Sequence, residues 1–368
     1  MMHTKLSATA ALLGSLIITA SFACTDFRLK ANDGTLLITR TMEFAIPMNA
    51  NLHSSSRDKV FQNTAPDGKP GLSWTAKYGY VYLDGMAINN TIDGMNEKGL
   101  SIEALYLPGE TTYQTVPVGA DAHALPYIAT GDWVLSNFRT VDEVKEALKK
   151  TYVFSQKIPG KGNTVFPLHF IINDASGKSI VVEYVKGQVK IHDDPLGVAT
   201  NSPTYDWQIT NLRNYVNLSP NLPSGHIING IMFGATGQGS GMNGLPGDAS
   251  PPSRFVKIAS LVATAIPADN TAAVLNLAQH IINNVDIPVG FVRAVENGKT
   301  NYDHTQWTVF KDLTHKIFYF RTYGDSTLRY VSLDKVDFSK NAVPLKMPID
   351  SSNTNSTVDV TNAFLHAK

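Results

Sequence analysis

Residues 24–44 read CTDFRLKANDGTLLITRTMEF, and the fold is best approached from this stretch. An Asn-Asp-Gly sequence at 32–34 is a strong signal for a tight hairpin turn. It separates two β-rich runs, Thr25–Lys30 and Thr35–Glu43. The pattern therefore predicts a β-hairpin that places Cys24 at the start of one strand and Arg40 near the end of its partner.

The residues before Cys24 have the pattern of a secretory signal peptide. A basic start at Met1–Lys5 is followed by an uncharged apolar segment, Leu6–Ala20, and by a Ser-Phe-Ala sequence at 21–23, with small residues where a signal peptidase reads. We predict that residues 1–23 are removed and that the protein is exported, either periplasmic or secreted. No later segment approaches about 18 consecutive apolar residues, so no membrane anchor is expected.

Cys24 is the single cysteine of the chain, and cleavage after Ala23 makes it the first residue. Three interpretations stay open. A lipoprotein also begins with an acylated cysteine, although its signal normally has leucine where Ser21 stands. An incidental thiol is the second interpretation, but a free terminal cysteine is a liability in an oxidising compartment. The third is an N-terminal nucleophile whose own α-amine, with a pKa of about 7.7–8.0 in model peptides, moves protons.

The remaining sequence predicts strands and helices in separate groups. Helical periodicity is present at 127–138, 141–151, 253–266 and 271–285. Further strands are expected at 166–173, 179–185, 189–192, 197–200, 306–310, 316–322 and 328–332. Because strands cluster, then helices, then strands again, the order favours an α+β layered fold over a doubly wound parallel sheet. One domain at 24–346 and a polar C-terminal tail at 347–368 are expected.

Composition excludes several classes of function. The chain has 31 basic and 31 acidic side chains, so nucleic acid and anionic membranes, which call for a basic excess, are not expected partners. One cysteine rules out an intramolecular disulfide and a metal site built on several thiolates. Residues 239–244 match a dinucleotide-binding pattern but lie in a glycine-rich run, which predicts a loop. For Trp74, core packing and a substrate-binding role both stay open.

The stretch that begins at Cys24 resembles the start of the choloylglycine hydrolase family, which includes penicillin V acylases and conjugated bile salt hydrolases. Three further blocks agree in order: DGMNEKGL at 93–100, TNSPTYDW at 200–207 and LPGDASPPSRF at 245–255. The resemblance runs from Cys24 to at least Trp307. It implies a four-layer αββα sandwich of the N-terminal nucleophile hydrolase type, usually assembled as a homotetramer.

The resemblance also implies catalytic roles for individual residues. Cys24 matches the nucleophile, and Arg40 matches an arginine close to the thiol, where a fixed positive charge favours thiolate. Glu43 stands where many members have an aspartate that positions the α-amine, and glutamate is one methylene longer. Arg254 matches a second active-site arginine.

Two more residues match the oxyanion donors of the family. Asn201 matches the asparagine whose side-chain amide is one donor, and Tyr106 matches the residue whose backbone N–H is the other. Bile salt hydrolases typically carry asparagine at the position of Tyr106, and tyrosine there looks more like the penicillin V acylases.

The expected reaction is hydrolysis of a linear carboxamide in a small-molecule acyl amide, with an apolar acyl pocket and without a metal or organic cofactor. Tyr106 favours a penicillin V acylase-like or N-acyl homoserine lactone acylase activity, with conjugated bile salts as the alternative substrates. The alternative that is not an enzyme is an exported lipoprotein or binding module on the same scaffold.

Overall fold

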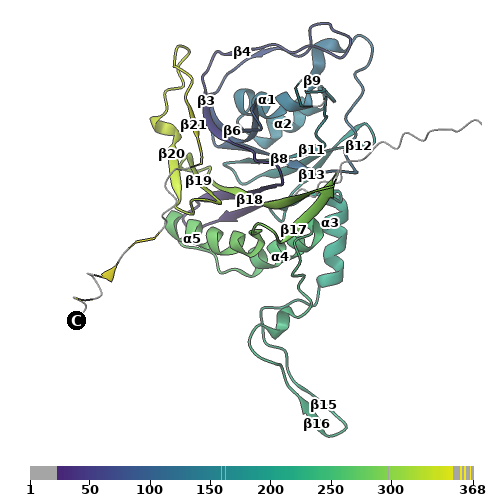
Figure 1. Cartoon of the computed structure of the whole chain (residues 1–368), viewed down its shortest axis with the longest axis vertical. Coiled ribbons are helices and arrows are strands. Elements are labelled where there is room, and N and C mark those ends of the chain that lie inside the picture. The colour runs from purple at the N-terminus through teal and green to yellow at the C-terminus, as the bar shows by residue number, and fades with distance from the viewer. Residues whose placement is uncertain are drawn as a thin grey trace, which may run out of the picture.

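The computed structural model describes residues 23–158, 160, 161, 163–296, 298–350, 357, 358, 360, 361 and 365. Apart from Ala23, the predicted signal peptide lies outside the described residues, as does most of the predicted tail. Two large β-sheets pack face to face, and helices cover their outer faces (Figure 1). This arrangement of four layers confirms the predicted αββα sandwich.

The first sheet is built around the predicted hairpin. Its seven strands run in the order β14-β1-β2-β18-β19-β20, with β17 paired to β18. Cys24 is the first residue of β1 and lies opposite Met42 of β2, while Asp26 lies opposite Arg40. The strands are β1 (Cys24–Lys30), β2 (Leu36–Phe44), β14 (Val198–Ala199), β17 (Val292–Glu296), β18 (Lys299–Asp312), β19 (Ile317–Thr322) and β20 (Arg329–Ser332).

The second sheet has eight strands in the order β13-β12-β11-β8-β7-β6-β3-β21. They are β3 (Asn51–Ser55), β6 (Tyr80–Gly85), β7 (Ile88–Asn96), β8 (Leu100–Tyr106), β11 (Leu168–Asp174), β12 (Ser179–Val185), β13 (Gln188–Asp193) and β21 (Lys346–Pro348). Because β21 pairs with β3 and Ile349 is buried, the packed chain continues past the boundary predicted at residue 346.

Helices lie on both outer faces, largely where periodicity predicts them. Helices α1 (Thr130–Asn137) and α2 (Val141–Leu148) cover the eight-stranded sheet, while α4 (Pro251–Thr264) and α5 (Thr271–Ile282) cover the seven-stranded sheet (Figure 1). The short α3 (Tyr205–Asn211) follows β14. Helix α4 begins with two prolines, which suit a first turn because its N–H groups have no partner inside the helix.

Helix α1 lies close to β7 because glycine stands on both sides of the contact. A Cβ on Gly94 of β7 would lie 2.7 Å from a methyl of Leu135, and a Cβ on Gly131 of α1 would lie 2.7 Å from Thr91. Either side chain would therefore push the helix off the sheet.

The sandwich has two interior layers that matter for function. The inner layer is the space between the two sheets, and the outer layer lies between the eight-stranded sheet and α1 and α2. Strand β8 shows the alternation: Ile102 and Ala104 belong to the outer cluster, whereas Leu105 belongs to the inner one. Glu103, which shares the face of Leu105, is therefore a charged residue in the inner layer.

Strands β3, β6, β7 and β8 lie in a region where the sequence predicts no strand. In β7 and β8 the alternation is hard to see because buried polar residues occupy strand positions, among them Asp93, Asn96, Ser101 and Glu103. The remaining short elements are β4 (Val60–Phe61), β5 (Trp74–Thr75), β9 (Ala124–Pro126) and β10 (Tyr152–Phe154).

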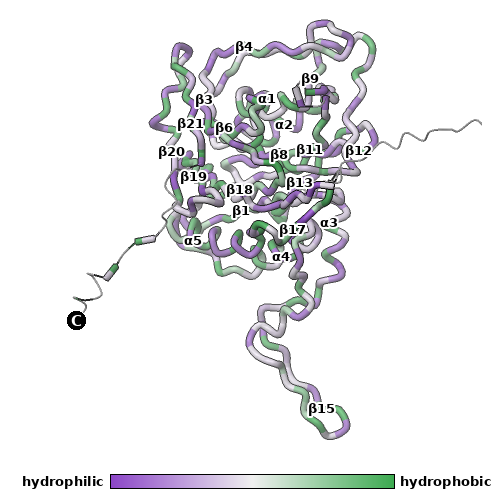
Figure 2. Tube along the Cα trace, in the orientation of Figure 1, coloured by the Kyte–Doolittle hydropathy of each residue, from purple (hydrophilic) through white to green (hydrophobic). Residues whose placement is uncertain are grey.

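A long arm projects from the body between α3 and α4 (Figure 1). It ends in a hairpin of β15 (His226–Ile228) and β16 (Ile231–Phe233), whose residues are exposed although several are apolar (Figure 2). The glycine-rich segment 239–244 lies between this hairpin and α4 as a loop with one 3-10 turn, as predicted.

Candidate active site

The thiol of Cys24 lies in the inner layer, where β1 begins. Its neighbour on β2 is Arg40, whose Nη2 donates to Cys24 Sγ at 3.4 Å and to the carbonyl oxygen of Ala104 at 2.9 Å. The guanidinium of Arg40 also lies over the ring of Trp307 at 4.6 Å. The hairpin register therefore brings a buried cation to the thiol, as the resemblance implies.

The backbone of Cys24 is held by residues from two other segments. Asn201, which follows β14, accepts through Oδ1 from Cys24 N at 2.6 Å. Arg254 of α4 donates to Cys24 O at 2.6 Å and to Asn201 Oδ1 at 2.9 Å. Nδ2 of Asn201 donates to the carbonyl oxygen of Tyr106 at 2.8 Å. Four segments far apart in the chain thus meet at Cys24.

Glu43 reaches the same place from β2. Thr305 Oγ1 donates to Glu43 Oε1 at 2.7 Å, and the backbone N–H of Glu43 donates to the carbonyl oxygen of Ala23 at 3.0 Å. Burial raises the pKa of Glu43 to about 7, while Arg254 and hydrogen bonds to Thr305 and Thr41 oppose the rise. A carboxyl group that gains or loses a proton near neutrality therefore lies beside the thiol.

The electrostatics of Cys24 are the balance of two large effects. Burial raises the pKa of the thiol, because a thiolate is poorly solvated there, and the charge of Arg40 lowers it. Glu43 adds to the rise. In the described chain Cys24 is still joined to Ala23, and burial outweighs the cation. Arg40 therefore favours the thiolate, as expected, but burial has the larger effect in this chain.

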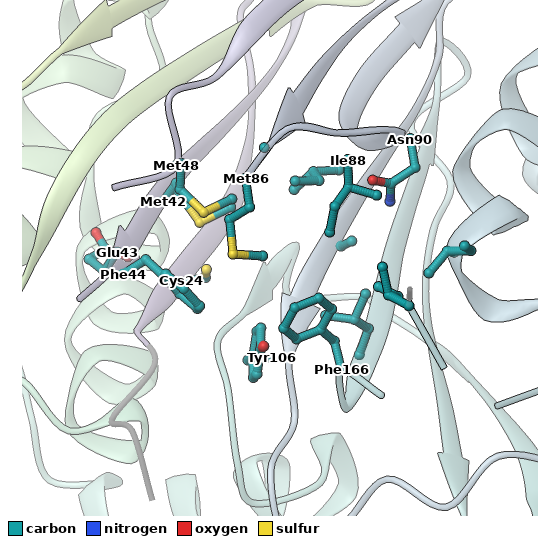
Figure 3. A pocket seen from close by; sticks show the side chains of 16 residues that line it. Cys24, Met42, Glu43, Phe44, Met48, Met86, Ile88, Asn90, Tyr106 and Phe166 are labelled. Carbon is teal, nitrogen blue, oxygen red and sulfur yellow. The ribbon is translucent and has the colours of Figure 1, made fainter. Parts of the chain in front are cut away.

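An apolar pocket opens at Cys24 (Figure 3). Figure 3 shows the thiol beside Met42, Met48 and Met86, with Tyr106 and Phe166 across from them. The ring of Tyr106 contacts those of Phe44 and Phe166, with centroids 5.7 and 5.8 Å apart. Apart from the groups at Cys24, Asn90 supplies an amide to this lining. Such a surface suits an apolar acyl group, and methionine side chains adapt to irregular shapes.

Trp74 is not brought to this pocket. Its ring stacks on Phe61 with centroids 4.9 Å apart, and its Nε1 donates to Ser136 Oγ at 2.8 Å. Both contacts lie among strands β4 and β5 and helix α1, so the substrate-binding alternative for Trp74 gives way to packing.

The structure adds residues that sequence reasoning missed. The hydroxyl of Thr25 accepts from Arg254, and the hydroxyl of Thr305 donates to Glu43. Lys311 and Asp93 lie behind Arg40. Asp93 belongs to the DGMNEKGL block, so a signal for it was present. Nothing in the sequence around Lys311 distinguishes it from a surface lysine.

Neither a metal-binding cluster nor a membrane-spanning helix is present among the residues that the structure describes. In this part of the chain no group of three or more His, Cys, Asp or Glu side chains is placed to hold a metal ion. None of its helices combines the length and the apolar character that crossing a membrane requires.

Comparison with known proteins identifies the family. The family model for linear amide C–N hydrolases of the choloylglycine hydrolase family matches residues 24–356. A bile salt hydrolase/transferase from Clostridium perfringens is 35% identical over 326 residues, which are 87% of this chain and 95% of that protein.

Solved structures agree with the sequence comparison. A mutant of the conjugated bile acid hydrolase from Clostridium perfringens has a TM-score of 0.79 at 30% identity, and the match covers 92% of this chain and all of that one. Penicillin V acylase from Agrobacterium tumefaciens has a TM-score of 0.71 at 26% identity, and the match covers 88% and 91% of the two chains. The expected N-terminal nucleophile hydrolase fold is confirmed. The chain is thus a linear amide hydrolase, and it belongs to the choloylglycine hydrolase family.

Proposed function

We propose that Cys24, released as the N-terminal residue, is the nucleophile that hydrolyses a linear carboxamide. The observation that carries the proposal is the position of its Sγ, at the end of an apolar pocket and 3.4 Å from Arg40 Nη2. Asn201 and Arg254 hold the backbone on either side of the thiol. A nucleophile fixed on its backbone can attack a carbonyl that the pocket presents.

The proposed reaction has two steps. As Sγ attacks the amide carbon, the α-amine takes the proton of the thiol and passes it to the leaving nitrogen. The C–N bond then breaks to leave a thioester and a free amine. Water, deprotonated by the same amine, then attacks the thioester and releases the acyl group as a carboxylic acid. Glu43, buried beside Cys24, orients the amine.

The oxyanion in this scheme is held by Asn201 and by the backbone N–H of Tyr106. The amide of Asn201 has two hydrogens on Nδ2, and one of them is donated to the carbonyl oxygen of Tyr106. The second supports a role as oxyanion donor. One such donor is typically worth a factor of about 10²–10³ in rate.

Cys24→Ala tests the nucleophile. We expect it to abolish amide hydrolysis, by a factor of about 10⁴ or more, with little loss of stability. Cys24→Ser should keep a trace of activity, because a hydroxyl is hardly ionised at neutral pH. If Cys24→Ala hydrolysed penicillin V, a long-chain acyl homoserine lactone or glycocholate at the rate of the wild type, the nucleophile would have to be another residue.

For the substrate, we propose the acyl amides of a penicillin V acylase or an N-acyl homoserine lactone acylase. The aromatic cluster of Tyr106, Phe44 and Phe166 supports a flat or slim acyl group. Conjugated bile salts are the second candidate, favoured by the 35% identity to the clostridial bile salt hydrolase/transferase. A panel of penicillin V, a long-chain acyl homoserine lactone and glycocholate decides by kcat/KM, and a preference for glycocholate refutes the first candidate.

We further propose export to the periplasm or the medium, with removal of residues 1–23. Support comes from the signal-like sequence and from the need of the mechanism for a free α-amine at Cys24. Intact-mass analysis of the exported protein should show a chain that begins at Cys24 without diacylglycerol. A lipidated cysteine would favour the lipoprotein alternative, and a retained Ala23 would contradict the mechanism.

Finally, we propose that the chain assembles as a homotetramer, with the β15–β16 arm as a contact between copies. Five apolar side chains of the hairpin, at 227, 228 and 231–233, are 54–68% exposed. Exposed apolar patches of this kind mark interaction sites. Light scattering should show tetramers for wild type and for Val118→Asp, which alters an exposed residue elsewhere, and smaller species for Ile231→Asp. A monomeric wild type at micromolar concentration would overturn the proposal.

A further inference from the structure

A buried ionic network lies in the inner layer directly behind Arg40. Lys311 of β18 comes from the same sheet as Arg40, while Asp93 of β7 and Glu103 of β8 come from the opposite sheet. All four side chains are fully buried. Groups of this kind are costly to bury, so their position beside the thiol calls for an explanation.

Asp93 is shared between two cations, and the sharing is unequal. Lys311 Nζ lies 2.6 Å from its Oδ1, whereas Arg40 Nη1 lies 3.4 Å from its Oδ2. Lys311 also pairs with Glu103. The other terminal nitrogen of Arg40, Nη2, points to Cys24 Sγ and to the carbonyl oxygen of Ala104. Lys311 therefore takes the larger part of the charge of Asp93, and Arg40 the smaller.

We propose that Lys311 is a positioning residue for the nucleophile: by neutralising Asp93 and Glu103, it keeps the Arg40 guanidinium directed at the Cys24 thiol. The inference rests on the proposed role of Cys24. Without Lys311, two buried carboxylates would compete with the thiol for the charge of Arg40. The pair would then draw the guanidinium toward the opposite sheet.

The surrounding charges agree with this assignment. Burial first and then the charge of Glu103 raise the pKa of Asp26 well above its usual range, which favours the uncharged form of this neighbour. Two cations then balance two carboxylates in the network. The charged or titratable groups that face the thiol are Arg40, Glu43, Tyr106 and Arg254. Those in and around the network behind it are Asp26, Asp93, Glu103, Asp194 and Lys311.

The test is the rate at which iodoacetamide alkylates Cys24, followed by mass spectrometry between pH 5 and 9. The chain has one cysteine, so the modified site is unambiguous. Lys311→Met should lower the rate at pH 7 by about tenfold and move the pH profile upward, because one pKa unit is a factor of ten in thiolate. Asp93→Asn should do the opposite, since it releases Arg40 from its competing anion.

The double variant Asp93→Asn with Lys311→Met separates charge from packing. It removes one charge of each sign, so its alkylation profile should return toward that of wild type. Lys311→Arg, which keeps the charge, should stay within about threefold of wild type, as should Lys335→Met, an exposed control. A purely structural role predicts slower alkylation in every variant of the network, and that result would overturn the proposal.

Folding is checked by the thermal unfolding temperature of each variant. If Lys311→Met does not fold, Asp93→Asn decides: faster alkylation supports the proposal, and an unchanged or slower rate contradicts it. Alkylation needs no substrate, so this result is independent of amide hydrolysis. Should Cys24→Ala retain activity, the proposed nucleophile fails, whereas the link between Lys311 and the thiol is judged by the alkylation profiles alone.

Discussion

The inner layer between the two sheets and the outer layer beneath α1 and α2 contain different kinds of side chain. The outer layer is an apolar cluster that includes Ile172 and Val182, with Asp132 at its edge held by the hydroxyls of Tyr80 and Thr91 at 2.7 and 2.6 Å. The inner layer instead pairs buried carboxylates with cations, as at Arg40, Asp93, Glu103 and Lys311. The same sheet therefore presents an apolar face to its helices, whereas on its face toward the other sheet Asp93 and Glu103 stand among apolar residues such as Leu105 and Ile171.

This difference separates stability from chemistry. Burying an ion costs several kcal/mol before its partner compensates, and an apolar layer reaches the same packing without that loss. The inner layer retains the charges where the thiol lies. We infer that the outer layer mainly holds the fold together, while the inner layer gives up stability to create a site. Each prediction below tests that division, from the largest expected effect to the smallest.

The largest effect is expected from truncating an amide in the inner layer. Asn201→Ala should lower kcat by about 10²–10³, because an oxyanion donor is lost. Steady-state kinetics measure kcat, and thermal unfolding measures the stability of each variant. Asn137→Ala is the matched control: its amide donates to the carbonyl oxygen of Trp133 in the outer layer, so it should reduce stability but spare kcat. Equal losses of kcat in both variants would remove the distinction between the layers.

A second pair of variants compares neighbouring residues of β11 that face opposite layers. Ile172→Ala, in the outer layer, should lower the free energy of unfolding by about 3 kcal/mol and leave kcat of the folded enzyme unchanged. Ile171→Ala, beside Glu103 in the inner layer, should lose similar stability and also lose kcat, since the cavity lets the ionic network relax. Denaturant titration with kinetics on the folded fraction measures both. An unchanged kcat in Ile171→Ala would contradict the comparison.

The third prediction concerns pH. Burial raises the pKa of Glu183, but two imidazoles whose ring nitrogens lie 3.5 Å from its carboxylate, those of His169 and His192, together with the N–H of Tyr205 at 2.8 Å, outweigh burial and lower it to about 2. A carboxyl with a depressed folded pKa stabilises the protein above its ordinary pKa, and this stability is lost as pH falls toward 2. Between about pH 4.5 and 2 we expect the free energy of unfolding to fall by an amount on the order of 2 kcal/mol. This pH dependence should be absent in Glu183→Gln and present in Ile172→Ala. Denaturant unfolding at a series of pH values measures this dependence. If the free energy of unfolding of Glu183→Gln changed with pH as steeply as that of wild type, the assignment to Glu183 would be wrong.

The smallest effect is expected at the pocket. Tyr106→Asn should move the ratio of kcat/KM for glycocholate to that for penicillin V upward by about threefold to tenfold, since it removes an aromatic face and widens the pocket. Amide hydrolysis should survive because the backbone N–H is unchanged. Ile88→Val, another change in the lining, serves as the control and should leave the ratio nearly constant. A ratio that does not rise in Tyr106→Asn would assign selectivity to other residues.

Much of the fold was predictable because its signals are local. The Asn-Asp-Gly turn predicted β1 and β2, and apolar periodicity predicted four helices on the outer faces. Strands β7 and β8 were missed for a physical reason. Their inner positions include Asp93 and Glu103, so the alternation that identifies a half-buried strand is broken by charges whose partners lie on other strands.

The sequence by itself determined a cysteine preceded by a signal-like segment, the hairpin that puts Cys24 at the start of one strand and Arg40 near the end of its partner, and the family to which these motifs point. Only the tertiary structure decided what surrounds them: that Arg254 and Asn201 hold the backbone of Cys24, that Trp74 packs elsewhere, and that Lys311 lies behind Arg40. Hairpin pairing depends on neighbours in the chain, whereas the pairing of a buried charge depends on which strands the two sheets bring face to face. No local pattern records that encounter.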